Sequence, residues 1–362
     1  MATVTEREVL DALRGVRDPD LGRDIVSLGF VKDVQVAEGG GTVGFTIELT
    51  TPACPVRELM QRQARQAVAA LPGVRVVDVA MTSRVRASGG ERKQALTPTI
   101  KNIVPVASGK GGVGKSTVTA NLALALAGTG ARVGIMDADV YGPTIPTLLG
   151  LRTLPKPTPE GKIVPAMQYG VKVISMGFFI REDDAIIWRG PMLHKTVLHF
   201  LGNVDWGELD YLIVDLPPGT GDVQLTLCQS IPLTGAAVVS TPQDVALKVA
   251  QKAIAMFNTL NTPVLGIIEN MASYRCPHCG AQDDVFGAGG ARQAAERLEL
   301  PFLGAIPLAT AIRTSSDAGR PIVLDAASEF APAYLAVAEQ LAAQVSIRTM
   351  QRELTPLVQI QF

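Results

Sequence analysis

The spacing of apolar residues divides the chain into two regions with different periods. Near the N-terminus, the stretch TVGFTIELT (42–50) alternates apolar with small or polar residues, which is typical of a strand with one buried face. Further upstream, Thr5 and Glu8 have the spacing of a capping box and precede apolar residues at helical intervals. Residues 1–86 are therefore predicted to form a small α+β domain.

The expected element order in this domain is helix, strand, strand, helix, strand. The first helix follows Thr5, and the later elements are expected at residues 24–36, 42–50, 56–71 and 74–85. Residues 87–99, ASGGERKQALTPT, are rich in glycine, charge and proline, and this composition predicts a linker.

From about residue 100 to residue 345, apolar stretches alternate with longer amphipathic ones. The apolar stretches are NIVPVAS, RVGIMDAD, VKVISMG, YLIVDLPP, GAAVVSTP, VLGIIEN and FLGAIPL. Continuous apolar character indicates strands covered on both faces, as in a parallel sheet. The pattern predicts a doubly wound α/β domain over residues 100–345. Residues 346–362 form a tail to which the pattern assigns no element.

Composition narrows the function classes. The 362 residues favour about two domains, and a formal net charge of −1 argues against a dedicated nucleic-acid binder. No apolar run reaches ~20 residues, so no membrane span is expected. Four cysteines do not make a disulfide framework, and MATVTEREVLDAL lacks the apolar core of a signal peptide. We expect a cytoplasmic protein with reduced thiols that binds neither nucleic acid nor membrane.

The first long apolar strand is followed by GKGGVGKS (109–116), which matches the phosphate-loop pattern between a strand and a helix. Its glycines permit the positive φ values that turn backbone N–H groups toward phosphate oxygens. Lys115 is expected to reach the β- and γ-phosphates of ATP, and the Ser116 hydroxyl to bind Mg²⁺. The predicted ATP-binding residues are Gly109, Lys110, Gly111, Gly112, Val113, Gly114, Lys115, Ser116 and Thr117.

Lys110 gives the loop the form K-G-G-x-G-K-[ST], which resembles the "deviant" P-loop class. The resemblance implies that this lysine reaches across a dimer interface to the nucleotide of the partner. There it would supply charge to the transition state, as an arginine finger does. The alternative is a solvated loop lysine.

Three further polar residues end apolar strands of the same domain. Asp215 is expected to help hold Mg²⁺, and the following loop 216–222 is suited to sensing a γ-phosphate. Asp139 is a candidate for orienting the attacking water, with Asp137 as its competitor or a structural residue. Asn270 is a candidate for reading an adenine edge, and an Asx turn is the alternative.

SYRCPHCGAQ (273–282) contains one Cys-x-x-Cys pair, Cys276 and Cys279, and closed structural sites usually take four ligands. A thiol oxidoreductase site requires a long helix after the pair, but the glycines in GAQDDVFGAGG disfavour one. A zinc site within one chain lacks nearby ligands. Two copies meeting at this loop on a two-fold axis supply four thiolates, which suit a [4Fe–4S] cluster or a zinc ion equally well.

Four motifs together resemble the Mrp/ApbC family of iron–sulfur cluster carrier ATPases: GKGGVGKSTVTANLALALA, MDADVYGPTIPTLLG, IVDLPPGTGD and ENMASYRCPHCG. The resemblance covers essentially residues 100–340. DPDLGRDIVSLGFVKDV and TPACP resemble the small domain of iron–sulfur assembly factors. The family implies ATP hydrolysis and transfer of a labile [4Fe–4S] cluster, with apoproteins and assembly factors as partners of a homodimer.

The other two cysteines, Cys54 and Cys228, are predicted to have different environments from each other. Cys54 precedes Pro55, a residue favoured at the first helical position, so its thiolate is expected at a helix N-terminus. It is a candidate transfer thiol, and the alternative is a small buried residue. Cys228 lies among helix-face leucines and is predicted to be core.

Two rival functions share some of these features. A ParA/MinD-type spatial-organisation ATPase has the same P-loop but acts through basic surfaces or a terminal amphipathic helix. The tail QRELTPLVQIQF has a proline and little basic charge. An electron donor resembling nitrogenase reductase also has a bridging cluster, but its ligands are single, well-separated cysteines.

Overall fold

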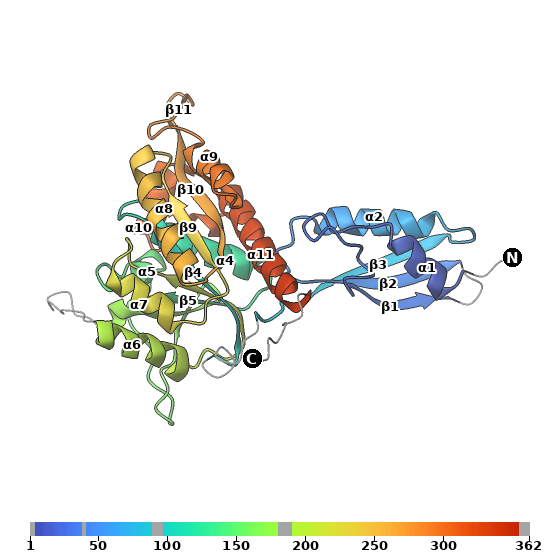
Figure 1. Cartoon of the computed structure of the whole chain (residues 1–362), viewed down its shortest axis with the longest axis horizontal. Coiled ribbons are helices and arrows are strands. Elements are labelled where there is room, and N and C mark those ends of the chain that lie inside the picture. Colours follow the sequence, from blue (N-terminus) through green and yellow to red (C-terminus); the bar gives the residue numbers. More distant parts are fainter. Residues whose placement is uncertain (1–3, 38–40, 89–96, 180–189, 355–362) are drawn as a thin grey trace, which may run out of the picture. The chain divides into compact units, whose positions relative to one another are not determined.

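The computed structural model describes residues 4–37, 41–88, 97–179 and 190–354. They form two compact units, of which one contains the described residues up to 86 and those from 350, and the other residues 87–349 (Figure 1). Most of the predicted linker, residues 89–96, and residues 355–362 of the predicted tail lie outside the described residues. The rest of the predicted tail, residues 346–354, was assigned no element but forms the last turns of a helix that begins at Ala331.

The first unit contains the expected order of helix, strand, strand, helix, strand. The elements are α1 (Glu6–Leu13), β1 (Val31–Val36), β2 (Thr42–Leu49), α2 (Arg57–Ala69) and β3 (Val76–Ser83). β2 is the central strand, antiparallel to β1 and parallel to β3. The capping box is confirmed, because the Thr5 N–H donates to Glu8 Oε2 at 2.8 Å and the Glu8 N–H donates to Thr5 Oγ1 at 3.3 Å.

The first strand is shorter than the apolar pattern predicts. β1 begins at Val31 instead of residue 24, because Asp24 Oδ1 accepts hydrogen bonds from the N–H groups of Val26 and Ser27 and closes a turn. Gly29 then adopts a φ of 71°, which no extended strand accommodates. Apolar residues in this turn, Ile25 and Leu28 among them, still reach the core of the unit.

The second unit is built on a nine-stranded sheet with the order β11-β10-β9-β4-β8-β5-β7-β6, in which β12 also pairs with β10. The strands are β4 (Ile100–Ser108), β5 (Val133–Asp137), β6 (Ala166–Gln168), β7 (Val171–Ser175), β8 (Leu209–Asp215), β9 (Ala236–Ser240), β10 (Val264–Arg275), β11 (Gln282–Asp283) and β12 (Phe302–Leu308). All pairings are parallel except β6 with β7 and β10 with β11. The doubly wound parallel sheet predicted from the apolar runs is confirmed.

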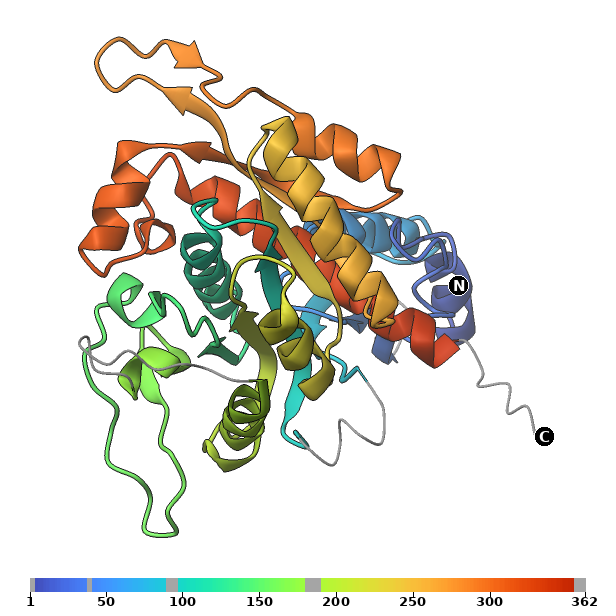
Figure 2. The same ribbon diagram turned by 60° about the vertical axis from the view of Figure 1, so that its left-hand side comes forward.

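Helices cover both faces of this sheet, and Figure 2 shows α8 in front of it and α11 behind. The helices are α4 (Lys115–Gly128), α5 (Ile145–Leu148), α6 (Gly190–Asn203), α7 (Asp222–Ser230), α8 (Asp244–Thr259), α9 (Gly290–Arg297), α10 (Thr310–Asp317) and α11 (Ala331–Leu354), with short 3₁₀ turns η1 (Met176–Phe178) and η2 (Ile322–Leu324). α4 is rich in alanine and leucine and packs on β5 and β8, where it is buried over most of its length.

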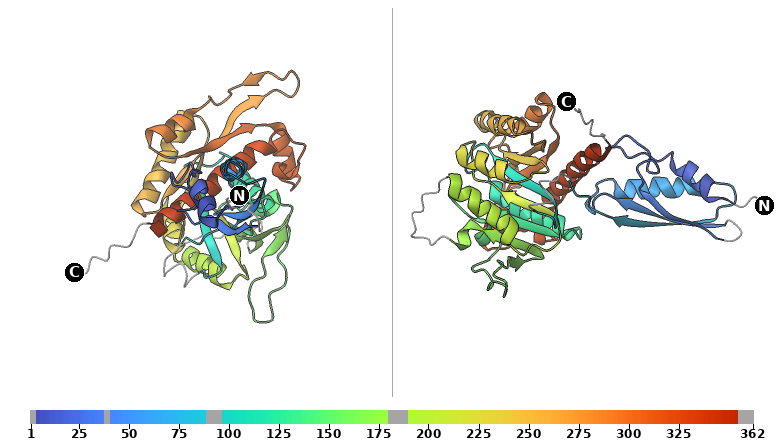
Figure 3. Two further views of the ribbon diagram at one scale, coloured as in Figure 1. Left: turned by 90° about the vertical axis from the view of Figure 1, so that its right-hand side faces the viewer. Right: turned by 60° about the horizontal axis from the view of Figure 1, so that its bottom comes forward.

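One end of β10 extends beyond the rest of the sheet. The apolar run predicts a strand that ends at Asn270, but β10 continues to Arg275 and turns back through β11. The resulting hairpin projects from the body of this unit (Figures 2 and 3). None of the helices within the described ranges combines the length and apolar character that crossing a bilayer requires.

Candidate nucleotide site and cysteine hairpin

The glycine-rich loop connects the end of β4 at Ser108 to the start of α4 at Lys115. Gly112 and Gly114 have φ values of 80° and 78°, so only two of the four glycines use the left-handed conformation expected of them. Gly109 serves another purpose: a Cβ there would lie 2.4 Å from the Val249 carbonyl carbon. Its missing side chain therefore lets the backbone of α8 approach the loop.

Lys115 is buried at the first turn of α4 and contacts two carboxylates. Its Nζ lies 2.7 Å from Asp215 Oδ2 and 3.7 Å from Asp139 Oδ2. It also donates to Ser116 Oγ at 3.2 Å, and Ser116 Oγ donates to Asp215 Oδ2 at 2.6 Å. The structure thus brings together the predicted phosphate-binding lysine, the predicted Mg²⁺ hydroxyl and both aspartates.

Thr119 completes this cluster and is absent from the residues that sequence reasoning selected. Its Oγ1 lies 2.7 Å from Asp215 Oδ1 and 3.0 Å from the Lys115 carbonyl oxygen. Its place one helical turn after Lys115 was the available signal, because residues i and i+4 share a face of a helix. Thr119 and Ser116 therefore fix both oxygens of the fully buried Asp215.

The two aspartates at the carboxyl end of β5, Asp137 and Asp139, have different surroundings. Asp137 accepts hydrogen bonds from Ser175 Oγ at 2.8 Å and from the N–H groups of Asp139 and Ile145. Burial, and secondarily the carboxylate of Asp215, raises the pKa of Asp137 to about 8. Burial also raises the pKa of Asp139, although the Lys115 ammonium opposes the shift. Asp137 is thus built into the core.

Asp139 instead faces a cavity of about 230 Å³ beside the loop. The lining consists of loop residues, Asp139 and two neighbours: Ser108, Lys110, Gly111, Gly112, Val113, Gly114, Lys115, Ser116, Thr117, Asp139, Thr144 and Pro218. The pyrrolidine of Pro218 comes from the Gly/Pro loop that follows Asp215. This arrangement provides a lysine, a hydroxyl, a carboxylate and the N-terminus of α4 around one space, which suits a bound polyphosphate.

Lys110 is held by its own chain in this structure. Its Nζ donates to Gln243 Oε1 at 3.2 Å, and Gln243 is the N-cap residue of α8. Sequence reasoning did not select Gln243, because its approach to Lys110 arises only when β9 and β4 become neighbours in the sheet. Lys110 is partly buried.

Asn270 lies against the loop as well. Its Nδ2 donates to the Val113 carbonyl oxygen at 2.8 Å, and the residue is buried. The side chain therefore supports the loop backbone, a contact that the apolar pattern does not show. The neighbouring Glu269 accepts from the N–H groups of Gly289 and Ala291 and so caps the start of α9.

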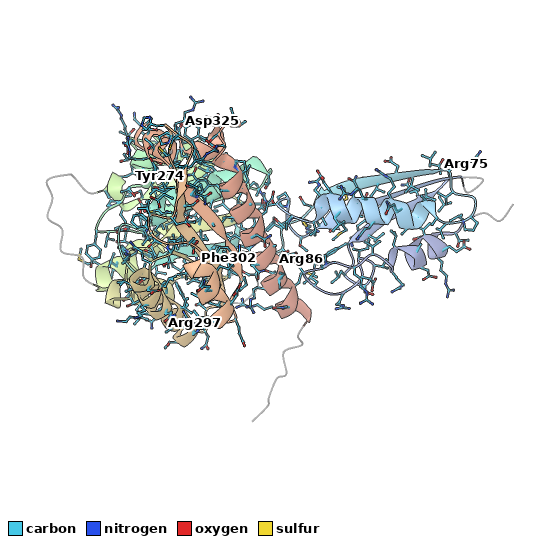
Figure 4. All side chains as sticks on the ribbon, turned by 90° about the horizontal axis from the view of Figure 1, so that it is seen from above. Arg75, Arg86, Tyr274, Arg297, Phe302 and Asp325 are labelled. Carbon is cyan, nitrogen blue, oxygen red and sulfur yellow. The ribbon has the colours of Figure 1, made fainter. Side chains whose placement is uncertain are left out.

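Cys276 and Cys279 lie in the turn of the hairpin formed by β10 and β11. The Cys276 N–H donates to the Ala281 carbonyl at 2.9 Å, and the Gly280 N–H donates back to the Cys276 carbonyl at 2.9 Å. Cys279 is exposed and Cys276 is half-buried. Tyr274, labelled in Figure 4, belongs to the last stretch of β10 and pairs with Asp283 in β11. No long helix follows the pair, as the glycines predicted: α9 begins at Gly290.

The hairpin favours the charged form of one thiol. The backbone N–H groups of Cys279 and His278 and then the Cys279 thiol lower the pKa of Cys276. Among the described residues, no group of three or more His, Cys, Asp and Glu side chains is placed to hold a metal ion. The two histidines outside the hairpin do not join the pair, since His194 contacts Ser230 and His199 contacts Asn203.

Cys54 lies further from the start of α2 than predicted. Pro55 is not the first helical residue, because α2 begins at Arg57 after the N-cap Val56. Burial raises the pKa of Cys54 to about 11 although the N–H of the N-cap residue Val56 lowers it, and the carboxylates of Asp18 and Asp20 act in the same direction as burial. The expected net stabilisation of the thiolate is therefore wrong, because burial outweighs the contribution of this N–H.

Cys228 is in the core, as predicted. It belongs to the main apolar cluster of the second unit and is 4% exposed. Burial raises the pKa of its thiol to about 12, so it stays protonated at neutral pH.

The strand, glycine-rich loop and helix, with Lys115, Ser116 and the Asp215 carboxylate, define a P-loop NTPase. The sequence model of the family described as "NUBPL iron-transfer P-loop NTPase" matches residues 99–342, and the chain belongs to this family. A second family, described as "Iron-sulfur cluster assembly protein", matches residues 6–81. The predicted family relationship of both regions is thereby confirmed.

Curated relatives match nearly the whole chain. An iron-sulfur cluster carrier protein of Synechocystis is 46% identical over 353 residues, which are 96% of this chain and 99% of the relative. An iron-sulfur cluster carrier protein of Escherichia coli is 44% identical and covers 80% of this chain and 79% of its own length.

Solved structures match about two thirds of the chain. A nucleotide-binding protein from Archaeoglobus fulgidus in complex with ADP is 42% identical, with a TM-score of 0.57 over 64% of this chain and 92% of that one. The Pyrococcus furiosus cell division ATPase MinD is 25% identical, with a TM-score of 0.51 over 66% of this chain and 97% of that one. Both likenesses support the predicted P-loop fold.

Proposed function

We propose that this protein is an ATP-hydrolysing iron–sulfur cluster carrier that holds a labile [4Fe–4S] cluster between two copies of the chain and transfers it to apoproteins. The family to which it belongs is described by iron transfer, and the curated relatives are named cluster carriers. In this proposal the cluster is the transferred substrate, and the nucleotide site binds and hydrolyses ATP.

The observation on which the proposal depends is the exposed hairpin with two thiols. Cys276 and Cys279 stand at the tip of a projecting element, and no third metal-binding side chain joins them within the described ranges. A second copy of the same hairpin supplies the two missing thiolates by symmetry. A cluster held mainly by two exposed turns is also accessible to an acceptor, which suits a carrier better than an electron donor.

The residues of the loop fit a magnesium nucleotide. Hydroxyl and carboxylate oxygens are the ligands that Mg²⁺ prefers, and Ser116 and Asp215 already lie within hydrogen-bonding distance of each other. We propose that these two residues hold the ion and that residues 109–117 bind ATP. Bound Mg²⁺ would neutralise charge on the phosphates, and Lys115 would turn from the carboxylates to the phosphate oxygens.

Hydrolysis is assigned to two further residues. Asp139 faces the cavity and is proposed to orient the attacking water. Lys110 is proposed to leave Gln243 and reach the nucleotide of the second copy, where its charge stabilises the transition state. Reading of the adenine edge by Asn270 remains a prediction, in addition to its contact with Val113.

We propose the domain division predicted above, with an assembly-type domain over residues 1–86 and an ATPase domain over residues 100–345. We also propose a transfer role for Cys54 in the first of these domains and a cytoplasmic location for the protein. A cluster ligand at Cys54 has to lose its proton first, and burial opposes that loss. Reduced thiols are the rule in the cytoplasm, and all four cysteines are free.

The test is anaerobic reconstitution of wild type, Cys276→Ser and Cys279→Ser, followed by iron analysis and transfer to an apo-acceptor. Each single substitution leaves the dimer with two thiolates, so we expect loss of stable cluster and retained nucleotide binding. Cys228→Ser is the matched control, because it makes the same chemical change at a cysteine that is buried in the core and is not a proposed ligand. Full cluster content in the Cys276→Ser/Cys279→Ser double variant contradicts the proposal. A cluster that binds but does not transfer favours an electron donor.

A further inference from the structure

β10 physically connects the nucleotide site to the cysteine hairpin. Asn270, within this strand, contacts the phosphate loop, and the same strand ends at Arg275, directly before Cys276. No loop or change of element separates the two sites along this path. A displacement of the strand at Asn270 therefore reaches the hairpin through continuous backbone.

The contact at the nucleotide end is close and buried. Asn270 Nδ2 donates to the Val113 carbonyl at 2.8 Å, and a Cβ built on Gly114 would lie 2.3 Å from the same nitrogen. Asn270 is 6% exposed, so water does not readily replace the lost partner if the loop moves. When N–H groups of the loop close on phosphate, the Val113 carbonyl cannot shift without either moving Asn270 or breaking this bond.

The strand is firmly held before this point and less so after it. Its pairing with β9 ends at Glu269, which also caps α9. Beyond Asn270, the register with β12 shifts before it resumes at Tyr274. Met271, inside this shift, has a φ of 58°, a left-handed conformation that is uncommon for a residue other than glycine. Irregular backbone therefore lies between the Asn270 contact and the hairpin, where a small change in φ or ψ re-aims the hairpin.

We propose that Asn270 is a positioning residue that couples nucleotide binding at the P-loop to the conformation of the Cys276–Cys279 hairpin through β10. The inference rests on the proposed function only in taking the P-loop and the hairpin as binding sites. Coupling of this kind is reciprocal. Metal bound at the hairpin therefore alters nucleotide affinity by the factor by which bound nucleotide alters metal affinity. It assigns a route by which ATP controls loading or release of the cargo.

The test measures thiol reactivity in the reduced, metal-free full-length protein. Iodoacetamide alkylation is followed by mass spectrometry of the tryptic peptide from Cys276 to Arg292, with and without Mg²⁺ and a nonhydrolysable ATP analogue. In wild type the analogue is expected to change the alkylation rate about fivefold or more, the lower end of typical coupling. Because Asn270 is also the candidate adenine-reading residue, Asn270→Ala and the isosteric Asn270→Asp, which has no donor for the Val113 carbonyl, are measured at an analogue concentration that saturates each variant. At saturation both are expected to show less than about half of the wild-type change.

Asn121→Ala is the matched control. Asn121 is also buried and donates to a carbonyl next to the loop, that of Thr117 at 2.8 Å, but it lies on α4 and not on β10. It should keep the wild-type change. An unchanged thiol response in wild type, a full response in both Asn270 variants, or an equal loss in Asn121→Ala overturns the proposal. Loss of all analogue binding in both Asn270 variants also overturns it, by making Asn270 a binding residue. Because no metal is present, a failed cluster proposal leaves this result intact.

Discussion

Lys115 and Lys110 belong to the same loop but have different surroundings. Lys115 is 6% exposed and neutralises Asp215, whereas the ammonium of Lys110 donates to the neutral side chain of Gln243. We predict that Lys115→Ala abolishes nucleotide binding and lowers the free energy of unfolding by about 3 kcal/mol, since it leaves a buried carboxylate uncompensated. Lys110→Ala should retain ATP binding, lose hydrolysis and cost no more than about 1 kcal/mol.

Denaturant titration, nucleotide binding and ATPase rate at equal dimer content check both variants. Equal ATPase rates for Lys110→Ala and wild type would remove the proposed action of Lys110 on the other copy. A Lys115→Ala protein as stable as wild type would show that the buried ion pair contributes little in the nucleotide-free protein.

The cysteines provide a second prediction, from their protonation. The thiolate is the reactive form, and hydrogen bonds lower the pKa of Cys276 while burial raises that of Cys54 to about 11. At pH 8, Cys276 should therefore alkylate faster than Cys54 in the metal-free protein. Time-resolved peptide mass mapping measures both rates in one sample, and faster labelling of Cys54 would restore its role as an activated thiol.

The phosphate loop depends on one glycine far more than on another. Gly114 has a φ of 78° and no room for a Cβ beside Asn270. Gly111 has no positive φ, and the nearest atom to a Cβ built there would be Pro218 Cγ, at 3.9 Å. Gly114→Ala should lower the free energy of unfolding by at least about 1–2 kcal/mol, the usual strain of a left-handed residue, while Gly111→Ala changes it little. Equal stabilities of the two variants in thermal unfolding would contradict this geometry.

The long strands could be predicted because continuous apolar runs are a strong signal, and all seven expected in the second unit are present. The short β6 and β11 were not predicted, because three and two residues show no period. β1 lost its first half to an Asp24 turn that depends on side-chain hydrogen bonds.

The residues of the site also divide into those that a local motif predicts and those that only the folded chain brings together. The P-loop motif places Lys115 and Ser116 locally, so sequence suffices for them. The bonds of Gln243 to Lys110 and of Asn270 to Val113 join segments that are adjacent only in the folded sheet. The direction of the Cys54 pKa shift was predicted wrongly, because the burial that raises it is a tertiary property that the Pro55 signal does not report.

The division into two units predicts a functional fragment. Both the nucleotide loop and the hairpin lie within residues 87–349, and that unit has its own apolar core. Residues 87–349 alone should hydrolyse ATP and hold the cluster at the wild-type ratio per chain. A fragment that folds, by circular dichroism, but assembles no cluster would show that residues 1–86 contribute ligands, and Cys54 would then be the first candidate ligand.

The sharing of one cluster between two chains is the claim on which the whole account depends. Native mass spectrometry of the anaerobically reconstituted full-length protein measures it directly, because the mass gives the number of chains, irons and sulfides in one species. We expect two chains with four irons and four sulfides, and no cluster on single chains. A monomer that carries a complete cluster, or a dimer that carries two, would contradict it.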